Sequence, residues 1–421
     1  MNLISSNHDL ILDPKSKAPE SVIAIPSKSE LHRLLIASAV SDRQTRIECS
    51  RSMRSEDIDA TSDCLCALGA SVVFGDTYID VSPIENIPES PLLNCRESGS
   101  TLRFMLPIAA ALGAKASFIG SGRLPERPLG DLIGEMKNHG VSFSAEKLPF
   151  TLGGALSAGE YSISGKVSSQ YITGLLFALA TIDETSVINL TSSLESSAYV
   201  DITCDILTKF GIKALKKQDG YEVIGRKSFT SPKNISASGD WSNISYFLAS
   251  GALFAPIEVS NLDLDSSQGD KKILDILRDF GANVEIGKNT VKISPRERRA
   301  LTVNLEQIPD LLPTLAALAC FAEGESRFYG GARLRLKESD RIASVAAMIN
   351  SLGGDAIELP DGLIVKGKKP IGGVVDSYGD HRIVMASALI SRGCCENVKI
   401  LGANAVKKSY PAFFEEFGFD F

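Results

Sequence analysis

Three side chains that carry or can carry positive charge cluster at one expected helix start. In "IPSKSELHRLLIASAV", which begins at residue 25, apolar residues recur at helical spacing. Ser27 followed by Glu30 matches a capping box, so the helix should begin near Lys28. The first turn of a helix carries the positive end of its dipole and favours anionic side chains. Lys28, His32 and Arg33 at this end therefore predict a site for a bound anion.

Two further expected helix starts carry charged clusters. "RLKESDRIASVAAMINSLGG" predicts a helix with Lys337, Glu338 and Arg341 at its capped end. "YGDHRIVMASALI" places Arg382 two residues after Asp380, the expected cap. Each cluster read alone is equally typical of a solvated helix cap.

Arginine and lysine also occur in two loops. "GSGRLPERPLGDL" places Arg123 and Arg127 around two prolines, which stiffen the chain. Arginine is suited to bidentate binding of carboxylate or phosphate groups. "VKKSYPAFF" adds Lys407 and Lys408, which would otherwise form an ordinary basic surface patch.

Neutral hydrogen-bond donors open two more helices. "ESGSTLRFMLP" contains Gly99, where a ligand could approach the backbone closely. "VSSQYITGLL" offers two hydroxyls and an amide at Ser168, Ser169 and Gln170. These groups are donors for phosphate oxygens or, in the simpler interpretation, only a helix cap.

One carboxylate enters a strongly apolar helix. Asp310 in "QIPDLLPTLAALA" is either a helix cap or a catalytic carboxylate. With Glu338 it would supply acid and base groups among the cations. The sequence has no metal-ligand spacing, nucleophile triad, Walker A loop or dinucleotide-binding fingerprint.

A repeat of about 70 residues must position these groups. A helix end, a glycine, a strand, a polar turn and a second strand recur around Gly69, Gly140, Gly211, Gly281, Gly353 and Gly418. A glycine after a helix adopts the left-handed conformation that lets the chain reverse into a strand. The spacing predicts an α/β fold of six βαβαββ-like copies in two halves, with a break near residues 237–240.

Each copy also contains a second kind of helix start. The six starts are "SKSELHR", "ESGSTLR", "VSSQYIT", "SGDWSNI", "LKESDRI" and "YGDHRIV". All are rich in residues that cap helices. If the copies are equivalent, several positive helix ends could point at one anionic ligand.

The composition narrows the class of protein. The 421 residues carry a formal net charge of −7, which argues against a nucleic-acid partner. The first residues are not typical of a signal peptide, and no apolar stretch is long enough to span a membrane. The pattern of the eight cysteines favours a reducing cytoplasm as the location of the protein.

Taken together and in order, the motifs resemble one family over essentially the whole chain. "PSKSxxxR", "GST", "ERP", "VSSQ", "KESDR", "GDHR" and "KSYPxF" are similar to those of the 5-enolpyruvylshikimate-3-phosphate synthase family of enolpyruvyl transferases. The resemblance implies two pseudo-symmetric domains of three copies each, residues 1–26 with 240–421 and residues 27–239, and an active site in the cleft between them. It also implies a monomer that uses no cofactor and no metal.

The resemblance implies transfer of the enolpyruvyl group of phosphoenolpyruvate to the 5-hydroxyl of shikimate 3-phosphate, with release of phosphate through a tetrahedral ketal. Asp310, Glu338 and Lys28 would be catalytic. The shikimate 3-phosphate contacts would be Lys28, Ser29, Arg33, Ser168, Ser169, Gln170, Ser196, Tyr199, Asp310 and Lys337. The phosphoenolpyruvate contacts would be Lys28, Gly99, Arg127, Gln170, Arg341, Arg382 and Lys408.

The chain departs from the family pattern at two places. Leu31 and His32 stand where members often have Ser-Asn, and Arg333 stands where many have an Asn that contacts shikimate 3-phosphate. Two alternatives stay open at this point. One is the sister transferase that acts on UDP-N-acetylglucosamine, and the other is a non-catalytic anion-binding protein on the same scaffold.

Overall fold

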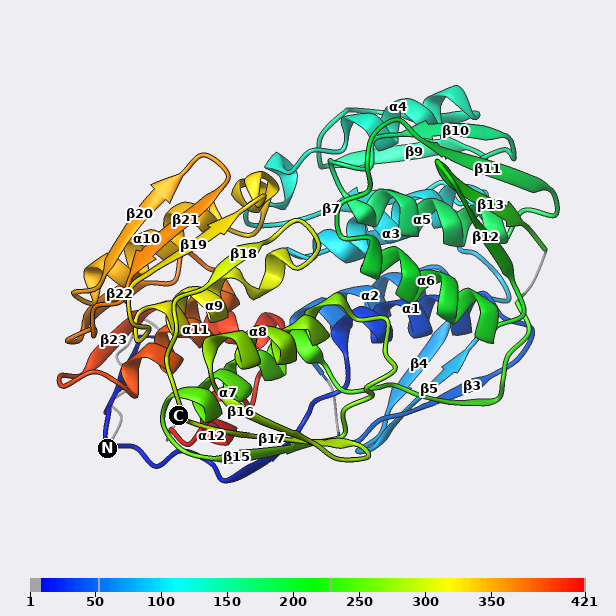
Figure 1. Cartoon of the computed structure of the whole chain (residues 1–421). Coiled ribbons are helices and arrows are strands. Elements are labelled where there is room, and N and C mark those ends of the chain that lie inside the picture. The colour runs from blue at the N-terminus through cyan, green and yellow to red at the C-terminus, as the bar shows by residue number, and fades with distance from the viewer. Residues whose placement is uncertain (1–8, 52–53, 227–228, 420–421) are drawn as a thin grey trace. The chain divides into compact units, whose positions relative to one another are not determined.

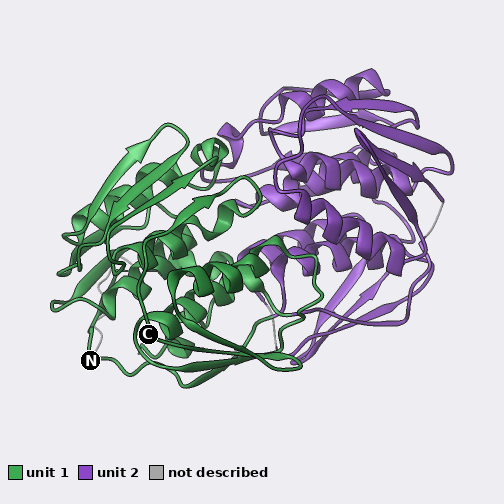
Figure 2. Cartoon of the chain, in the orientation of Figure 1, with its two compact units in different colours: residues 1–25, 239–421 green, residues 26–238 purple. Residues whose placement is uncertain are grey.

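The chain folds into two compact units in a computed structural model that describes residues 9–51, 54–226 and 229–419. Unit 1 contains residues 1–25 and 239–421, and unit 2 contains residues 26–238 (Figure 2).

The clearest copy of the repeat is in unit 2. It consists of β6 (Leu92–Asn94), α3 (Gly99–Ala111), β7 (Ser117–Ile119), η1 (Leu124–Glu126), α4 (Gly130–Asn138), β8 (Val141–Phe143) and β9 (Phe150–Gly154). The sheet order is β6-β7-β9-β8. Leu93 pairs with Phe118 in a parallel ladder, and the other two ladders are antiparallel. This is the βαβαββ copy predicted from the sequence.

Two more copies complete unit 2 (Figure 1). One contains β10 (Glu160–Ile163), α5 (Ser169–Ala180), β11 (Thr185–Leu190), α6 (Ser197–Lys209), β12 (Lys213–Lys217) and β13 (Gly220–Ile224). The other contains α1 (Lys28–Ala39), β3 (Thr45–Glu48), α2 (Glu56–Ala67), β4 (Ser71–Phe74) and β5 (Tyr78–Ser82), with β14 (Asn234–Ser236) as its first strand.

Unit 1 repeats the same pattern three times. Its first copy is β2 (Ser21–Ile23), α7 (Trp241–Leu253), β15 (Ile257–Ser260), η2 (Gly269–Lys272), α8 (Ile273–Phe280), β16 (Asn283–Ile286) and β17 (Thr290–Ser294). Its second is β18 (Thr302–Asn304), η3 (Pro309–Leu311), α9 (Leu312–Ala319), β19 (Glu325–Tyr329), η4 (Ala332–Leu336), α10 (Arg341–Ser351), β20 (Asp355–Leu359) and β21 (Gly362–Lys366). Its third is β22 (Gly373–Asp376), α11 (His381–Ser391), β23 (Val398–Leu401), η5 (Ala403–Lys408) and α12 (Phe413–Glu416), joined by β1 (Leu10–Leu12).

Three strands complete copies that are distant from them in sequence. β14 pairs in parallel with β3, and β2 pairs in parallel with β15. β1 pairs antiparallel with β23, so it fills out the last copy, which is short in the sequence. Each unit therefore contains a sheet in which one strand lies far along the chain from the strand it pairs with.

The six repeated glycines have the conformation that the sequence predicted. Their φ angles are +103° at Gly69, +93° at Gly140, +77° at Gly211, +105° at Gly281, +83° at Gly353 and +84° at Gly418. At Gly69 the fit is also steric, because a Cβ atom would lie 2.2 Å from the carbonyl oxygen of Asn86. Other residues rarely adopt this region, so the glycines end the helices.

The core of each unit is formed by the first helix of each copy. Every residue of α11 is buried, and α5 is buried except for Gln170 in its first turn. α3 packs against α5, and α9 packs against both α7 and α11. One expected start is wrong: "LKESDRI" begins α10, the second helix of its copy, and the equivalent first helix, α9, begins within "QIPDLLP".

Candidate active-site residues

The buried first helices of the two units begin with different caps. In unit 2, Ser27, Ser98 and Ser168 cap α1, α3 and α5 through their hydroxyl oxygens. In unit 1, the carboxylates of Asp240 and Asp380 cap α7 and α11.

This difference sets the charge at the helix starts. A neutral serine satisfies one of the free N–H groups at a helix start and leaves the positive end of the dipole uncompensated, whereas an aspartate offsets the dipole. The starts of α1, α3 and α5 are therefore the better phosphate-binding ends.

The predicted capping box at α1 is only half formed. The Ser27 hydroxyl accepts from the Glu30 backbone N–H at 3.4 Å, as expected. The Glu30 carboxylate does not return to Ser27. It accepts from the Ser238 hydroxyl at 2.5 Å and from the Ser238 backbone N–H at 2.9 Å, so it ties α1 to the end of unit 2.

Of the three groups at this helix start, His32 is not an anion ligand. Its ring is 1% exposed, and Nδ1 lies 2.7 Å from the hydroxyl oxygen of Thr61. Burial, followed by the charges of Lys28 and Arg33, holds the pKa of His32 well below its ordinary value. The ring is therefore neutral, and the expectation of three cations is wrong at this residue.

Arg33 is buried and fixes neighbouring segments. It donates from Nε to the Thr203 hydroxyl at 2.8 Å, from Nη2 to the Tyr199 carbonyl at 2.8 Å and from Nη1 to the Ser29 carbonyl at 2.6 Å. Burial lowers its pKa to about 10, which still leaves it charged at neutral pH. Arg33 thus brings Ser29 and Tyr199, both expected at the shikimate 3-phosphate site, to one place.

Lys28 has an acidic partner that the motifs did not reveal. Its Nζ lies 2.7 Å from Oδ2 of Asp57, and both side chains are mostly buried. Asp57 is in the first turn of α2, in "SEDIDA", where an acidic residue is ordinary for a helix start. The contact links the starts of α1 and α2.

Gly99 lies directly against two guanidinium groups. A Cβ atom at this residue would be 2.5 Å from Nη1 of Arg127 and 2.7 Å from Nη1 of Arg103. Arg103 donates to the side-chain oxygen of Gln170 at 3.2 Å, and Gln170 donates to the Ser100 hydroxyl at 2.9 Å. The structure therefore gathers Gly99, Arg127 and Gln170 at the adjoining starts of α3 and α5. Arg103 was missed, although it lies four residues after Gly99 in the quoted motif.

We expect Gly99→Ala to raise the KM for phosphoenolpyruvate, the ligand that the family resemblance assigns to Arg127. The added methyl group must displace the Arg127 and Arg103 guanidiniums, and a charge-assisted hydrogen bond contributes about 1.5–3 kcal/mol. Loss of one such bond corresponds to a KM increase of roughly ten- to a hundredfold. Steady-state kinetics measure this, with Gly113→Ala as the control. Its φ of +71° strains alanine, which the backbone at Gly99 does not, but nothing lies within 4 Å of its Cβ position.

Ser196 has an unusual backbone. Its φ is +52° and ψ is 46°, a left-handed conformation that is costly for a residue other than glycine, and it is 2% exposed. It immediately precedes α6, where Tyr199 lies in the first turn. Ser168 and Ser169 stand at the start of α5, so the expected hydroxyl donors all lie at helix starts.

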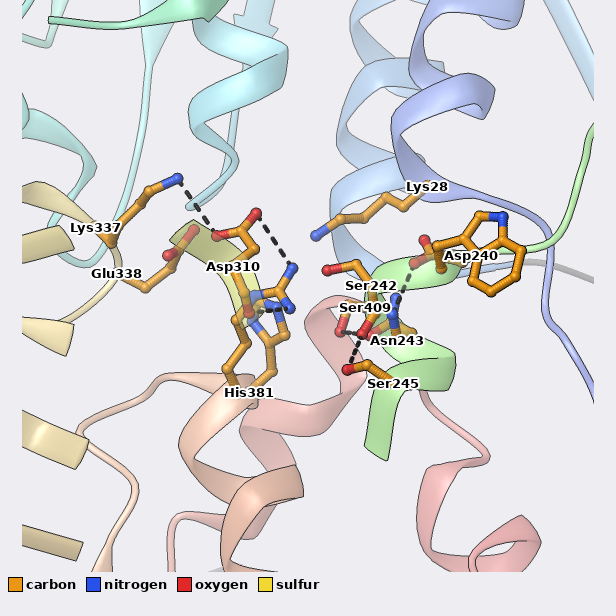
Figure 3. Close-up of polar contacts among 12 residues, drawn as sticks. Lys28, Asp240, Ser242, Asn243, Ser245, Asp310, Lys337, Glu338, His381 and Ser409 are labelled. Carbon is orange, nitrogen blue, oxygen red and sulfur yellow. Dashed lines mark hydrogen bonds and ion pairs between the residues drawn. The ribbon is translucent and has the colours of Figure 1, made fainter. Parts of the chain in front are cut away.

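In unit 1, Asp310 is surrounded by cations. Its Oδ1 lies 2.8 Å from Nη1 of Arg341 and 3.5 Å from Nζ of Lys337, and its Oδ2 lies 3.3 Å from Nη2 of Arg382. Figure 3 shows Lys337 and Glu338 beside Asp310. Asp310 lies inside η3, and the N-cap residues of η3 and α9 are Ile308 and Leu311, so the interpretation of Asp310 as the cap is wrong.

Arg341 is the centre of this cluster. It is 1% exposed, and besides Asp310 it binds Oε2 of Glu338 at 2.6 Å and Oδ2 of Asp380 at 2.9 Å. The Asp380 Oδ1 also accepts from the backbone N–H of Arg382 at 2.9 Å. One buried guanidinium therefore orients three carboxylates at the starts of α9, α10 and α11.

The cluster is balanced in charge. Asp310, Glu338 and Asp380 face Lys337, Arg341 and Arg382. Burial opposes the charge on Arg341, but its three carboxylate neighbours outweigh burial and raise its pKa.

In the same surroundings the pKa of Lys337 is lowered, whereas that of Arg341 is raised. Burial lowers the pKa of Lys337 to about 8, and the Asp310 charge offsets this only in part. Lys337 can therefore lose its charge in a slightly alkaline solution.

The structure also gives contacts for Lys408, an expected phosphoenolpyruvate ligand, and for Arg333, which departs from the family pattern. Lys408 in η5 donates to the Gly379 carbonyl at 2.8 Å, one residue before the Asp380 cap. Arg333 in η4 donates to the Glu306 carbonyl at 2.9 Å, which occupies part of its guanidinium.

Within the described residues, no helix is long and apolar enough to cross a membrane. The same residues contain no group of three His, Cys, Asp or Glu side chains arranged to hold a metal ion.

The fold is that of the enolpyruvyl transferases. EPSP synthase from Acinetobacter baumannii superposes with a TM-score of 0.79 at 22% identity, covering 97% of each chain. The enolpyruvyl transferase NikO from Streptomyces tendae gives 0.78 at 17% identity, covering 98% of this chain and 97% of that one.

Sequence comparison shows the family to which this chain belongs. Residues 14–417 match the model of EPSP synthase (3-phosphoshikimate 1-carboxyvinyltransferase), and the chain belongs to this family. The 3-phosphoshikimate 1-carboxyvinyltransferase of Clostridium kluyveri is 40% identical over 396 residues, which are 93% of this chain and 92% of that protein. Its counterpart in Clostridium perfringens (strain ATCC 13124) is 38% identical over 416 residues, 97% of each chain.

Proposed function

We propose that this chain transfers the enolpyruvyl group of phosphoenolpyruvate to the 5-hydroxyl of shikimate 3-phosphate and releases phosphate, in the shikimate pathway to aromatic amino acids. Family membership over residues 14–417 supports the reaction. The observation that carries it to particular residues is the Arg341 cluster, in which one buried cation holds the carboxylates Asp310 and Glu338.

The chemistry requires a base, an acid and fixed positive charge. In the proposal Asp310 accepts the proton of the 5-hydroxyl as its oxygen attacks C2 of phosphoenolpyruvate, and C3 gains a proton. The product is a tetrahedral ketal that keeps the phosphate. Loss of a proton from C3 and cleavage of the C2–O bond to phosphate then give the enol ether. Glu338 is the second acid/base group, and Arg341, Arg382 and Lys337 stabilise the anionic oxygens throughout.

Unit 2 would supply the other half of the binding groups. Serine-capped starts of α1, α3 and α5 suit phosphate oxygens because their dipoles are uncompensated. Ser168, Ser169, Gln170 and Ser196 are assigned to shikimate 3-phosphate, with Tyr199 against its ring. Arg127, beside Gly99, is assigned to phosphoenolpyruvate. We propose that the residues of both units act on the same pair of substrates.

The decisive experiment offers two acceptors to the purified protein. With phosphoenolpyruvate as donor, phosphate release should occur with shikimate 3-phosphate and not with UDP-N-acetylglucosamine. The sister transferase has a reactive cysteine in the loop that here reads "GRLPERP" and contains none. Release with UDP-N-acetylglucosamine alone would reverse the assignment, and release with neither acceptor would favour a non-catalytic anion-binding protein.

Arg127 and Arg382 give a test of the division between the two substrates. We expect Arg127→Ala and Arg382→Ala each to raise the KM for phosphoenolpyruvate by one to two orders of magnitude, since each loses charge-assisted bonds of about 1.5–3 kcal/mol. The affinity for shikimate 3-phosphate alone, measured by calorimetry, should change little. Equal loss of affinity for both ligands would contradict the assignment.

By resemblance to the family alone, we also propose a cytoplasmic monomer.

A further inference from the structure

A chain of buried hydrogen bonds crosses three helices of unit 2. It begins at His32 in α1, where Nδ1 lies 2.7 Å from the Thr61 hydroxyl oxygen in α2. The Thr61 oxygen lies 2.7 Å from the Thr101 hydroxyl oxygen in α3. The Thr101 hydroxyl donates at 2.8 Å to Oγ of Ser98, the cap of α3. All four residues are at most 2% exposed, and we call them the hydroxyl network.

The hydrogen bonds of the hydroxyl network follow one direction. A hydroxyl group has one proton, and the Thr101 proton goes to Ser98. Thr61 must then donate to Thr101, and the neutral His32 ring must carry its proton on Nδ1 to donate to Thr61. Each of these bonds then has a donor and an acceptor. A buried polar network that is satisfied in this way holds its members in one arrangement.

The hydroxyl network joins two helix starts that carry expected phosphoenolpyruvate-binding groups. Lys28 begins α1, and Gly99 begins α3, where it lies against Arg127. α2 packs against both helices (Figure 1), and its Thr61 is in the middle of the network. The ion pair between Lys28 and Asp57 joins α1 to α2 as well. The position of Gly99 relative to Lys28 therefore depends on bonds that pass through α2.

A different set of bonds holds the groups expected at shikimate 3-phosphate. Arg33 joins α1 to α5 through the Thr173 hydroxyl at 3.2 Å and to α6 through the Thr203 hydroxyl at 2.8 Å. The starts of α5 and α6 carry the serines expected at this ligand. These two bonds do not pass through Thr61, so loss of the Thr61 hydroxyl leaves them in place.

We infer that the hydroxyl network positions phosphoenolpyruvate-binding groups: it fixes Gly99, and Arg127 beside it, relative to Lys28. This inference rests on the proposed function. The members of the network act through other residues, so they are positioning residues and not ligands of the substrate.

The physical reason is the steep dependence of hydrogen bonds on distance and angle. A small shift of the α3 start moves the Arg127 guanidinium away from an anion that Lys28 also binds, which weakens charge-assisted bonds to that anion. His32, which departs from the family pattern, thus has a role other than that of the predicted cation.

The test removes the hydroxyl in the middle of the network. Thr61→Val keeps the shape of the side chain and breaks both of its hydrogen bonds. The KM for phosphoenolpyruvate should rise about three- to tenfold, the effect of roughly one buried neutral hydrogen bond. The kcat at saturating concentrations of both substrates, and the Kd of shikimate 3-phosphate alone, should each change less than about twofold. Thr61→Ser keeps the hydroxyl and should restore the wild-type KM.

The matched control is Thr45→Val. Thr45 in β3 is equally buried, and its hydroxyl oxygen lies 2.7 Å from that of Ser231. Thr45→Val should lower Tm about as much as Thr61→Val does, but it should leave the KM for phosphoenolpyruvate unchanged. A merely structural role for Thr61 predicts the same unchanged KM for both variants.

A wild-type KM in Thr61→Val, an equal rise in Thr45→Val, or equal loss of affinity for both ligands would overturn the inference. Absence of turnover in the wild type would instead overturn the proposed function. If Thr61→Val does not fold, Thr101→Val decides, because it breaks the same bond from the side of α3. It should raise the KM for phosphoenolpyruvate by a similar factor, and an unchanged KM would equally overturn the inference.

Discussion

Replacement of Asp310 by asparagine should lower kcat by about 10²–10⁴-fold, the usual contribution of a general base. Asparagine keeps the shape of the side chain and can still hydrogen-bond a hydroxyl, but it cannot accept the proton. The affinity for shikimate 3-phosphate should therefore change much less than kcat. Single-turnover and steady-state rates at saturating concentrations of both substrates measure the effect.

The matched control for Asp310→Asn is Asp340→Asn. Asp340 caps α10 through the Ala343 backbone N–H and pairs with Arg335, and asparagine caps helices equally well. Its kcat should stay within about threefold of the wild type. A near-normal kcat for Asp310→Asn would remove Asp310 as the base and move that role to Glu338 or Lys28.

Replacement of Arg341 by alanine should be the most destabilising change in the cluster, at about 3–5 kcal/mol. It leaves Asp310, Glu338 and Asp380 close together without the buried cation that pairs with all three. The free energy of unfolding, from urea titration at neutral pH, measures the loss.

Two further variants test whether the loss of stability in Arg341→Ala comes from the loss of the buried cation. Arg335→Ala removes a partly exposed arginine that pairs with Asp340 and Glu358, and it should cost only about 0.2–1 kcal/mol. Asp380→Asn in the Arg341→Ala background removes one uncompensated charge and keeps the cap of α11, so it should restore part of the stability. If Arg341→Ala cost no more than Arg335→Ala, the cluster would not depend on this cation.

The sequence alone determined the features that depend on residues close together along the chain. The six glycines end helices because only a residue without Cβ adopts their positive φ readily, and that requirement repeats about every 70 residues. The caps Ser27 and Asp380 act on backbone groups two or three residues away, so local pattern was enough to find them. The order of the short motifs was enough to indicate the family.

Only the tertiary structure decided the contacts between distant segments. Strands β14, β2 and β1 join sheets far from them in sequence, which no local periodicity can reveal. Glu30 was expected to close a capping box, but the neighbouring Ser238 offers it two donors.

The sequence left Asp310 open as a cap or a base, and it did not reveal that Arg341, 31 residues later, is its partner. His32 looked cationic because a sequence does not show burial. Charge states and pairings of buried groups depend on desolvation and on neighbours that only the folded chain brings together.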